Sequence, residues 1–244
     1  MLPRILELEL MDTAEDAREY DAMDHSTVNA QFVADLIEAM KTVGWVESHE
    51  THQVLPQGMV GLAELDPPDR SVLDLGAGTA QIPIEVARRA PMVHITAVDA
   101  AESMLAVGRQ NVAAAALAGR IDLVLADAKR LPFDSATFPL VISNSIVHHV
   151  AEPRHVIAEA VRVAAPGGLL FHRDLARPQS EEQLQHLVSD YAGDATPYQR
   201  KLFADSLRAA LTLEEMQQLV AELGFAPESV RMTSDRHWTW VSRK

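Results

Sequence analysis

The most constraining feature of this chain is an apolar run that ends in an acidic residue and two glycines. The run Val72-Leu73-Asp74-Leu75 leads directly into Gly76-Ala77-Gly78-Thr79-Ala80. In a doubly wound α/β sheet, such a strand passes through a glycine turn into a helix and brings bare backbone N–H groups against a ligand. Glycines at the turn leave no Cβ in the way. We therefore expect a ligand site at this turn.

Two further residues narrow the kind of ligand. Gln81 stands where the dinucleotide fingerprint has its third glycine, which serves helix packing beside a pyrophosphate. A ligand without a pyrophosphate does not need that glycine. Asp99 closes the next apolar run, Val93 to Val98, where an acid can accept hydrogen bonds from two ribose hydroxyls. The pattern favours a ribose-bearing ligand that has no pyrophosphate.

This combination resembles the class I S-adenosylmethionine-dependent methyltransferases. Asp127-Ala128 ends a third apolar run, where the acid of that family accepts a hydrogen bond from the adenine amino group. The run 138–144 is similar to the fourth strand of the family, and Ala165-Pro166-Gly167-Gly168 to the turn into the fifth. The resemblance implies S-adenosylmethionine as cofactor and S-adenosylhomocysteine as product. The cofactor-binding residues that it implies are Asp74, Gly76, Ala77, Gly78, Thr79, Gln81, Asp99, Ala100, Met104, Asp127, Ala128, Asn144 and Ser145.

From residue 71 onward, strand and helix patterns alternate regularly, which predicts a doubly wound, mostly parallel α/β sheet with helices on both faces. A helical insertion is expected at about 175–211, because that segment is too long for a plain connection. Two late strands bring the sheet to seven, and the resemblance implies that the last one is antiparallel. Strands are expected near 71–75, 93–98, 121–126, 138–144, 168–174, 228–233 and 236–242, and helices near 79–90, 102–117, 153–164 and 212–223.

Residues 1–70 precede this core, which spans 71–244. Apolar residues recur at helical spacing from Val28 to Met40; Ser26 or Thr27 can cap this helix and Gly44 can end it. The resemblance implies a helical lid that closes over the cofactor and helps to form the acceptor pocket. A solvated acidic leader is the alternative. The lid residues expected to contact the acceptor are Tyr20, Met23, His25 and Asn29.

Candidate catalytic residues follow strands four and five. His148 and His149 come after the fourth strand, and Asp174 ends the fifth. A histidine oriented by a carboxylate is a suitable general base near neutral pH. The spacing resembles that of sugar and other small-molecule O-methyltransferases, which use such a pair in this role. One of the two histidines is expected to be catalytic and the other structural, whereas His172 is expected to pack against a helix.

A second cluster lies near the predicted last strand. Arg177, Arg236 and Arg173 could bind a carboxylate or phosphate of the acceptor, with His237 beside them. Ion pairing with the surplus of acidic residues is the alternative for each arginine. Trp238 and Trp240 share one face of a strand and are expected to cover the core.

Charge and composition restrict the partners. Lys and Arg number 21 against 35 Asp and Glu, a net charge of −14, and the basic residues are scattered, so nucleic acid is not an expected substrate. There is no cysteine, and no signal peptide or membrane span is apparent, which predicts a cytoplasmic protein, monomeric or homodimeric. No catalytic metal is expected, because neither His49 with His52 nor the later histidine pair has a ligand set at recognisable spacing.

These features predict methyl transfer to a small molecule, with an oxygen or nitrogen nucleophile favoured and sulfur or carbon possible. A nicotinamide-dependent oxidoreductase is the nearest enzymatic alternative, and the missing third glycine argues against it. A protein that binds S-adenosylmethionine without turnover, as a regulator or subunit, is the alternative from another class. Such a binding module would have no use for His148, His149 and Asp174 around the methyl group.

Overall fold

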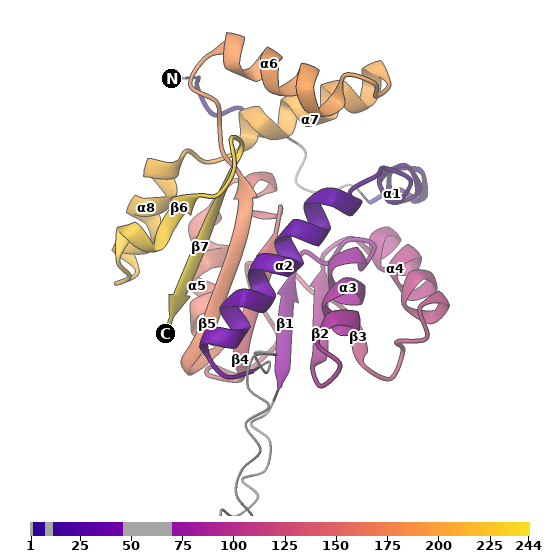
Figure 1. Cartoon of the computed structure of the whole chain (residues 1–244), viewed down its shortest axis with the longest axis vertical. Helices are drawn as coiled ribbons and strands as arrows, with labels where there is room; N and C mark the ends of the chain where they lie inside the picture. The colour runs from indigo at the N-terminus through magenta and orange to yellow at the C-terminus, as the bar shows by residue number, and fades with distance from the viewer. Residues whose placement is uncertain (1, 8–11, 46–69) are drawn as a thin grey trace, which may run out of the picture.

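A single sheet of seven strands organises the chain, in the order β3-β2-β1-β4-β5-β7-β6 (Figure 1). The computed structural model describes residues 2–7, 12–45 and 70–244. β7 runs antiparallel to both of its neighbours and the other strands are parallel, so the predicted architecture is confirmed. The strands are β1 (Ser71–Leu75), β2 (His94–Asp99), β3 (Ile121–Leu125), β4 (Phe138–Asn144), β5 (Ala164–Leu175), β6 (Val230–Met232) and β7 (His237–Arg243).

The fifth strand begins earlier than the expected residue 168. Ala164 already pairs with Phe138, and the register then shifts before Leu140 pairs with Leu169. The backbone N–H of Gly167 donates to the carbonyl of Lys244 at the end of the chain. The Pro-Gly-Gly stretch is therefore held against the last strand as an irregular part of β5.

Helices cover both faces of the sheet, as a doubly wound fold requires. On one face, apolar side chains of α2, α3 and α4 pack against Val72, Ile95 and Ile142. On the other face, α5 and α8 cover Leu73, Val141 and the two buried tryptophans of β7. These helices are α2 (Ser26–Thr42), α3 (Gln81–Arg89), α4 (Glu102–Ala114), α5 (Pro153–Val163) and α8 (Leu213–Glu222), and two short 3₁₀ turns are η1 (Val147–His149) and η2 (Pro227–Ser229).

Two helices follow β5 and form a cap above one end of the sheet (Figure 1). They are α6 (Glu181–Ala192) and α7 (Pro197–Ala209), and they pack on each other through an apolar cluster that includes Leu184, Leu187 and Leu207. Thr196 begins α7 with a capping box, and Thr212 begins α8 in the same way. Each helix start is thus encoded by a local threonine.

The N-terminal part contains one helix more than expected. The sequence indicated a single clear helix before the core, whereas the structure has both α1 (Ala14–Asp21), capped by Thr13, and α2. The expected cap of α2 is also wrong: Ser26 is the first helical residue, and its N–H donates to the side chain of Asp24. Asp24 therefore supplies the acceptor that a capping serine or threonine would have supplied. Residues 46–69 of the predicted lid segment lie outside the described residues.

Candidate active site

The glycine turn after β1 has backbone angles that favour glycine. Gly76 has φ +76° and Gly78 has φ +53°. A Cβ on Gly76 would lie 2.7 Å from Cδ1 of Ile146, so this position also requires close approach to the loop after β4. The N–H groups of Gly76 and Ala77 both donate to the carbonyl of Val98 at 2.9 Å, which ties the turn to the end of β2.

Asp99, at the end of β2, connects the glycine turn with the start of α4. One carboxylate oxygen accepts from the N–H of Gly78 at 2.8 Å, and the other accepts from the N–H of Ala101 at 2.9 Å. Burial raises the pKa of Asp99 above its ordinary value, although the three backbone N–H donors, including that of Ala100, act in the opposite direction. Each oxygen has a second lone pair, so the carboxylate can still accept from ligand hydroxyls.

A pocket extends from the glycine turn past Asp99 to the loop after β3. Most of the cofactor residues implied by the resemblance line it, together with Tyr20 of α1 and His149. Val98, Ala101, Ala126, Lys129, Ile146 and Val150 also line the pocket and were not singled out from the sequence. The predicted cofactor residues that line it are Gly76, Gly78, Asp99, Ala100, Met104, Asp127, Ala128 and Ser145.

Five predicted cofactor residues do not line this pocket: Asp74, Ala77, Thr79, Gln81 and Asn144. Asp74 is 2% exposed, and burial, with the nearby Asp99 charge, raises its pKa to about 8. One oxygen of this buried carboxyl, Oδ2, has no hydrogen-bond partner among the described residues. The amide of Gln81 instead connects neighbouring elements: its oxygen accepts from Asn29, and its nitrogen donates to Asp21.

Helix α1 lies over the mouth of this pocket and is fastened to α4. Asp12 accepts from the N–H and the hydroxyl of Ser103, at 3.0 and 2.8 Å. Asp21 accepts from the side chain of Asn111 at 2.9 Å. Tyr20 lines the pocket, and its ring lies 5.0 Å from that of His25. Neither His25 nor Met23 lines this pocket, and their predicted contact with the acceptor stays a prediction.

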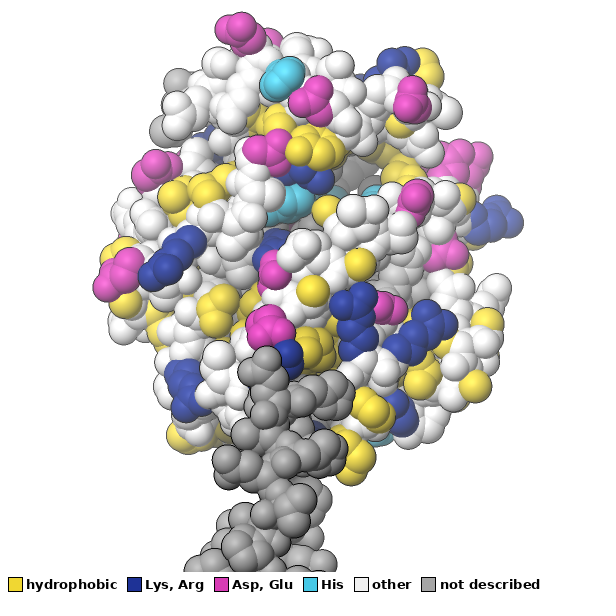
Figure 2. Space-filling model, viewed as in Figure 1, with side chains coloured by type: hydrophobic (Ala, Val, Ile, Leu, Met, Phe, Trp, Pro, Cys, Tyr) yellow, Lys and Arg dark blue, Asp and Glu magenta, His cyan; other side chains and the backbone are white. Residues whose placement is uncertain are grey.

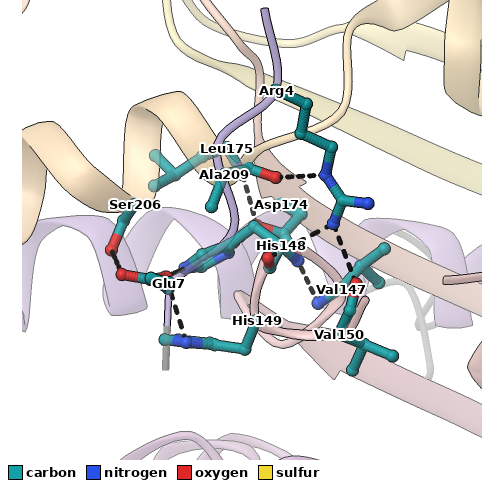
Figure 3. A network of polar contacts seen from close by, with 10 residues as sticks. All are labelled: Arg4, Glu7, Val147, His148, His149, Val150, Asp174, Leu175, Ser206 and Ala209. Atoms are coloured by element: carbon teal, nitrogen blue, oxygen red, sulfur yellow. Dashed lines mark hydrogen bonds and ion pairs between the residues drawn. The ribbon is translucent and has the colours of Figure 1, made fainter. Parts of the chain in front are cut away.

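The two histidines of η1 occupy different environments (Figure 3). His148 is 3% exposed, and its Nδ1 lies 2.5 Å from Oδ1 of Asp174, which is fully buried. Asp174 also accepts from the N–H groups of Val147, His148 and Leu175. Burial lowers the pKa of His148, but Asp174 and Glu7 outweigh it, so the net direction is upward. His149, by contrast, lines the cofactor pocket.

A short N-terminal strap, residues 2–7, reaches the same two histidines, and the sequence analysis did not single it out. Oε1 of Glu7 lies 3.1 Å from Nδ1 of His149 and 3.4 Å from Nε2 of His148. Its other oxygen accepts from the hydroxyl of Ser206 in α7. Among the described residues, Glu7, His148 and His149 place metal-ligand-type atoms within 4.8 Å of one another. No local spacing could have revealed this contact, because Glu7 is far from η1 along the chain.

The predicted arginine cluster does not converge on the pocket. Arg173 pairs with Asp35 of α2 at 2.6 Å, on the opposite side of the sheet from Asp174. Arg177 pairs with Glu215 and donates to the carbonyl of Ala210. Arg236 pairs with Asp235, and its guanidinium carbon lies 3.2 Å from the centre of the Tyr191 ring. The structure thus places these arginines in ion pairs, the alternative weighed for them.

Other predicted residues near the last strand are buried. His237 contacts the hydroxyl of Ser234, and burial together with Arg236 and Arg173 lowers its pKa to about 4. His172 packs on Trp240, with ring centroids 5.3 Å apart, and no hydrogen-bond partner reaches either of its ring nitrogens among the described residues. Burial lowers the pKa of His172 to about 3. Trp238 and Trp240 are fully buried, as their shared face indicated.

Figure 2 shows histidine side chains in the hollow between the cap and the sheet. A pocket at the carboxyl ends of parallel strands, with a glycine turn and an acid at the end of β2, is the arrangement of a class I S-adenosylmethionine-dependent methyltransferase.

Comparison with known proteins identifies the family. Residues 73–172 match the family model described as a methyltransferase domain. The chain is similar to the ubiquinone/menaquinone biosynthesis C-methyltransferase UbiE of Roseobacter denitrificans, with 30% identity over 176 residues that cover 68% of this chain and 70% of the relative. The enzyme of the same name from Geobacter sulfurreducens is 32% identical over 164 residues, which cover 63% and 64%. The chain therefore belongs to the class I S-adenosylmethionine-dependent methyltransferases.

Solved structures show the same fold at low sequence identity. A methyltransferase from Aquifex aeolicus aligns with a TM-score of 0.60 and 14% identity, over 95% of this chain and 98% of that one. The phosphoethanolamine N-methyltransferase 2 of Haemonchus contortus, solved with S-adenosylhomocysteine, aligns with a TM-score of 0.51 and 18% identity, over 64% of this chain and 33% of that one.

S-adenosylmethionine is the cofactor, and a small molecule accepts the methyl group. None of the helices in the described ranges combines the length and apolarity needed to cross a membrane.

Proposed function

We propose that this enzyme methylates a small molecule after His149 removes a proton from the acceptor, at an oxygen or nitrogen or at a carbon activated by a neighbouring hydroxyl. One observation carries the proposal: His149 lines the same pocket as Asp99 and Asp127, whereas His148 is buried against Asp174. The imidazole is a general base suited to neutral pH. The sequence left open which of the two histidines is catalytic; the proposal assigns His149 as the base and His148 as the structural residue.

The residues around the pocket fit S-adenosylmethionine. The turn at Gly76 and Gly78 brings the backbone close to the ligand, Asp99 has lone pairs for the ribose hydroxyls, and Asp127 lies farther along the same pocket for the adenine amino group. When bound, the cofactor supplies an electrophilic methyl group on a sulfonium. The protein then has to align the acceptor, exclude water and remove a proton.

Deprotonation by a general base can activate more than one kind of acceptor atom. Removing the proton of a phenol makes both its oxygen and the ring carbons beside it more nucleophilic. An oxygen or nitrogen centre is the prediction from the sequence, and the name of the similar UbiE enzymes favours a ring carbon as the second candidate. A phenol oxygen and the ring carbon beside it are activated by the same O–H deprotonation, so the assignment of His149 does not depend on the choice between these two atoms.

The experiment combines S-adenosylmethionine carrying a labelled methyl group with a panel of phenols, hydroquinones and small amines, and identifies each labelled product by mass spectrometry. With an acceptor in hand, His149→Ala should lower kcat by about 10²–10⁴ and leave cofactor affinity within a few-fold. His186→Ala, at an exposed histidine of the cap, is the matched control and should behave like the parent. Parental kcat in His149→Ala would contradict the proposal. Cofactor binding without transfer to any acceptor, in the panel or in cell extract, would instead favour the regulatory alternative.

A further inference from the structure

The N-terminal strap is attached to the cap and to the loop that carries both histidines. The guanidinium of Arg4 donates to the carbonyls of Ala209 in α7 and of His148, Val150 and Ala151 in and after η1. The N–H of Ile5 also donates to the carbonyl of Arg208. The strap is therefore held at both sides, which places the side chain of Glu7 at the histidines (Figure 3).

Glu7 brings a second carboxylate to a site that already contains Asp174. Only 14% of its side chain is exposed, and Oε1 is buried without a hydrogen bond of good geometry. A buried carboxylate is tolerated when a positive charge lies beside it. Two ring nitrogens lie beside Oε1, namely Nε2 of His148 and Nδ1 of His149.

A charge count indicates which imidazole carries the proton. The charged groups that act on His148 are Asp174 and Glu7, with two negative charges, and Arg4, with one positive charge, so a protonated His148 makes this group neutral. His148 has a carboxylate oxygen near each ring nitrogen, Asp174 at Nδ1 and Glu7 at Nε2. Only the doubly protonated ring presents an N–H to both carboxylates. His149 has Glu7 at Nδ1, which leaves its Nε2 not engaged with that carboxylate.

A divalent cation is the other occupant that these atoms could accept. The rings of His148 and His149 are stacked, with centroids 4.1 Å apart and planes inclined by 34°. Among the described residues, three ligand-type atoms come together here, one fewer than a closed tetrahedral zinc site uses. Oε1 of Glu7 itself lies 3.1 Å from Nδ1 of His149 and 3.4 Å from Nε2 of His148, so a carboxylate between two N–H groups accounts for the arrangement without an ion.

We propose that Glu7 is a positioning residue of the active site. Its carboxylate keeps His148 doubly protonated and holds the Nδ1–H tautomer of His149, so that Nε2 of His149 is the nitrogen that accepts the proton. The tautomer statement rests on the proposed function, but the protonation state of His148 does not. Among the described residues, the other charged groups that act on the rings are Asp174 from β5 and Arg4 from the strap, at His148, and Asp99 from β2, at His149.

The first test observes the rings directly. Long-range ¹H–¹⁵N correlation spectra of the full chain, assigned with His148→Gln and His149→Gln, report the protonation of each ring nitrogen. In the parent, His148 should be doubly protonated at pH 7 and His149 should be the Nδ1–H tautomer when neutral. In Glu7→Gln, His148 should lose a proton at lower pH and His149 should show mixed tautomers. Glu7→Asp should restore part of the parental pattern, and Glu182→Gln, an equal charge change at an exposed residue of α6, should change neither ring.

The second test separates positioning from mere folding. With an acceptor identified, Glu7→Gln should lower kcat at least ten-fold, change the KM for S-adenosylmethionine little and alter the pH profile, whereas Glu7→Asp should recover part of kcat. Ring spectra of Glu7→Gln that match the parent would overturn the positioning role, whatever the activity. If the ring spectra of Glu7→Gln match the parent but His149→Ala is inactive, the positioning role of Glu7 is wrong while the assignment of His149 as the base still holds. Stoichiometric metal in the purified enzyme that Glu7→Gln lacks would overturn the proposal in favour of a cation site.

Discussion

Asp12 caps α4 from a distant part of the chain, because its carboxylate accepts both the N–H and the hydroxyl of Ser103, ninety-one residues further on and near the start of that helix. No side chain of α4's own N-cap, Ala101, fills this position. These hydrogen bonds lower the pKa of Asp12 below its ordinary value. With the contact of Asp21 to Asn111, they hold α1 over the pocket that Asp99 and Tyr20 share.

The hydrogen bonds that Asp12 and Asp21 make with α4 should control how fast S-adenosylhomocysteine leaves the pocket. Asp12→Ala combined with Asp21→Ala should accelerate dissociation of S-adenosylhomocysteine several-fold and weaken its binding, because α1 would open more often. Loss of the cap at Ser103 should also lower the stability of the fold. Stopped-flow fluorescence and calorimetry measure these quantities. Glu19→Ala, at an exposed residue of α1, is the control; unchanged release in the double variant would show that α1 does not close the site.

The carboxylate of Asp99 predicts the strength of cofactor binding. Asp99→Ala should weaken binding of S-adenosylhomocysteine by about 1.5–3 kcal/mol, since charge-assisted hydrogen bonds to the ribose would be lost. NAD should not bind either protein. Calorimetry decides both points, with Asp122→Ala, at an exposed acid of β3, as the control. Some loss of stability should accompany the change, because the N–H groups of Gly78 and Ala101 would lose their acceptor. Equal affinity of variant and parent would remove Asp99 from the ribose site.

The sheet and most of the cofactor pocket could be predicted because their signals are local. The glycine turn, Asp99 and Asp127 each follow an apolar run, and the order of such runs determines which side chains meet at the carboxyl ends of parallel strands. The start of α2 was misplaced because Asp24 and the expected caps are equally plausible acceptors within three residues. Local patterns do not rank such near-equivalent choices.

The remainder of the site depends on contacts between distant segments. Arg4 and Glu7 contact η1 and the residue after it although they lie near the N-terminus, far from η1 along the chain. Asp12 likewise contacts α4 from a distant position in the sequence. Neither periodicity nor spacing carries information about such pairs. Arg177, conversely, fits a substrate clamp by residue type, but the nearby Glu215 binds its guanidinium once the chain is folded. Residue type alone could not distinguish these outcomes.

The close approach of Gly76 to Ile146 predicts a stability effect. Gly76→Ala combines a left-handed backbone with a Cβ that meets Ile146 at 2.7–2.8 Å, so it should destabilise the fold by about 1–3 kcal/mol. Gly119→Ala, where a Cβ meets nothing within 4 Å, is the matched control and should be neutral or slightly stabilising. Adding Ile146→Ala to Gly76→Ala separates the two causes in chemical denaturation. If the contact matters, the two changes together should cost less than the sum of the single ones.

The buried ring of His172 predicts a pH dependence of stability. Its pKa falls from an ordinary 6.5 to about 3 in the fold, so between these values the unfolded chain binds a proton that the folded chain does not. The free energy of unfolding therefore decreases as the pH drops from about 6.5, by at most about 1.4 kcal/mol per pH unit from this residue. His172→Phe keeps an aromatic ring against Trp240 and removes two unpartnered nitrogens. Its stability relative to the parent should grow as the pH is lowered from 7 to 4 in urea denaturation, whereas His186→Phe, at an exposed histidine, should follow the parent. A constant difference across that range would mean that a partner not present among the described residues satisfies His172.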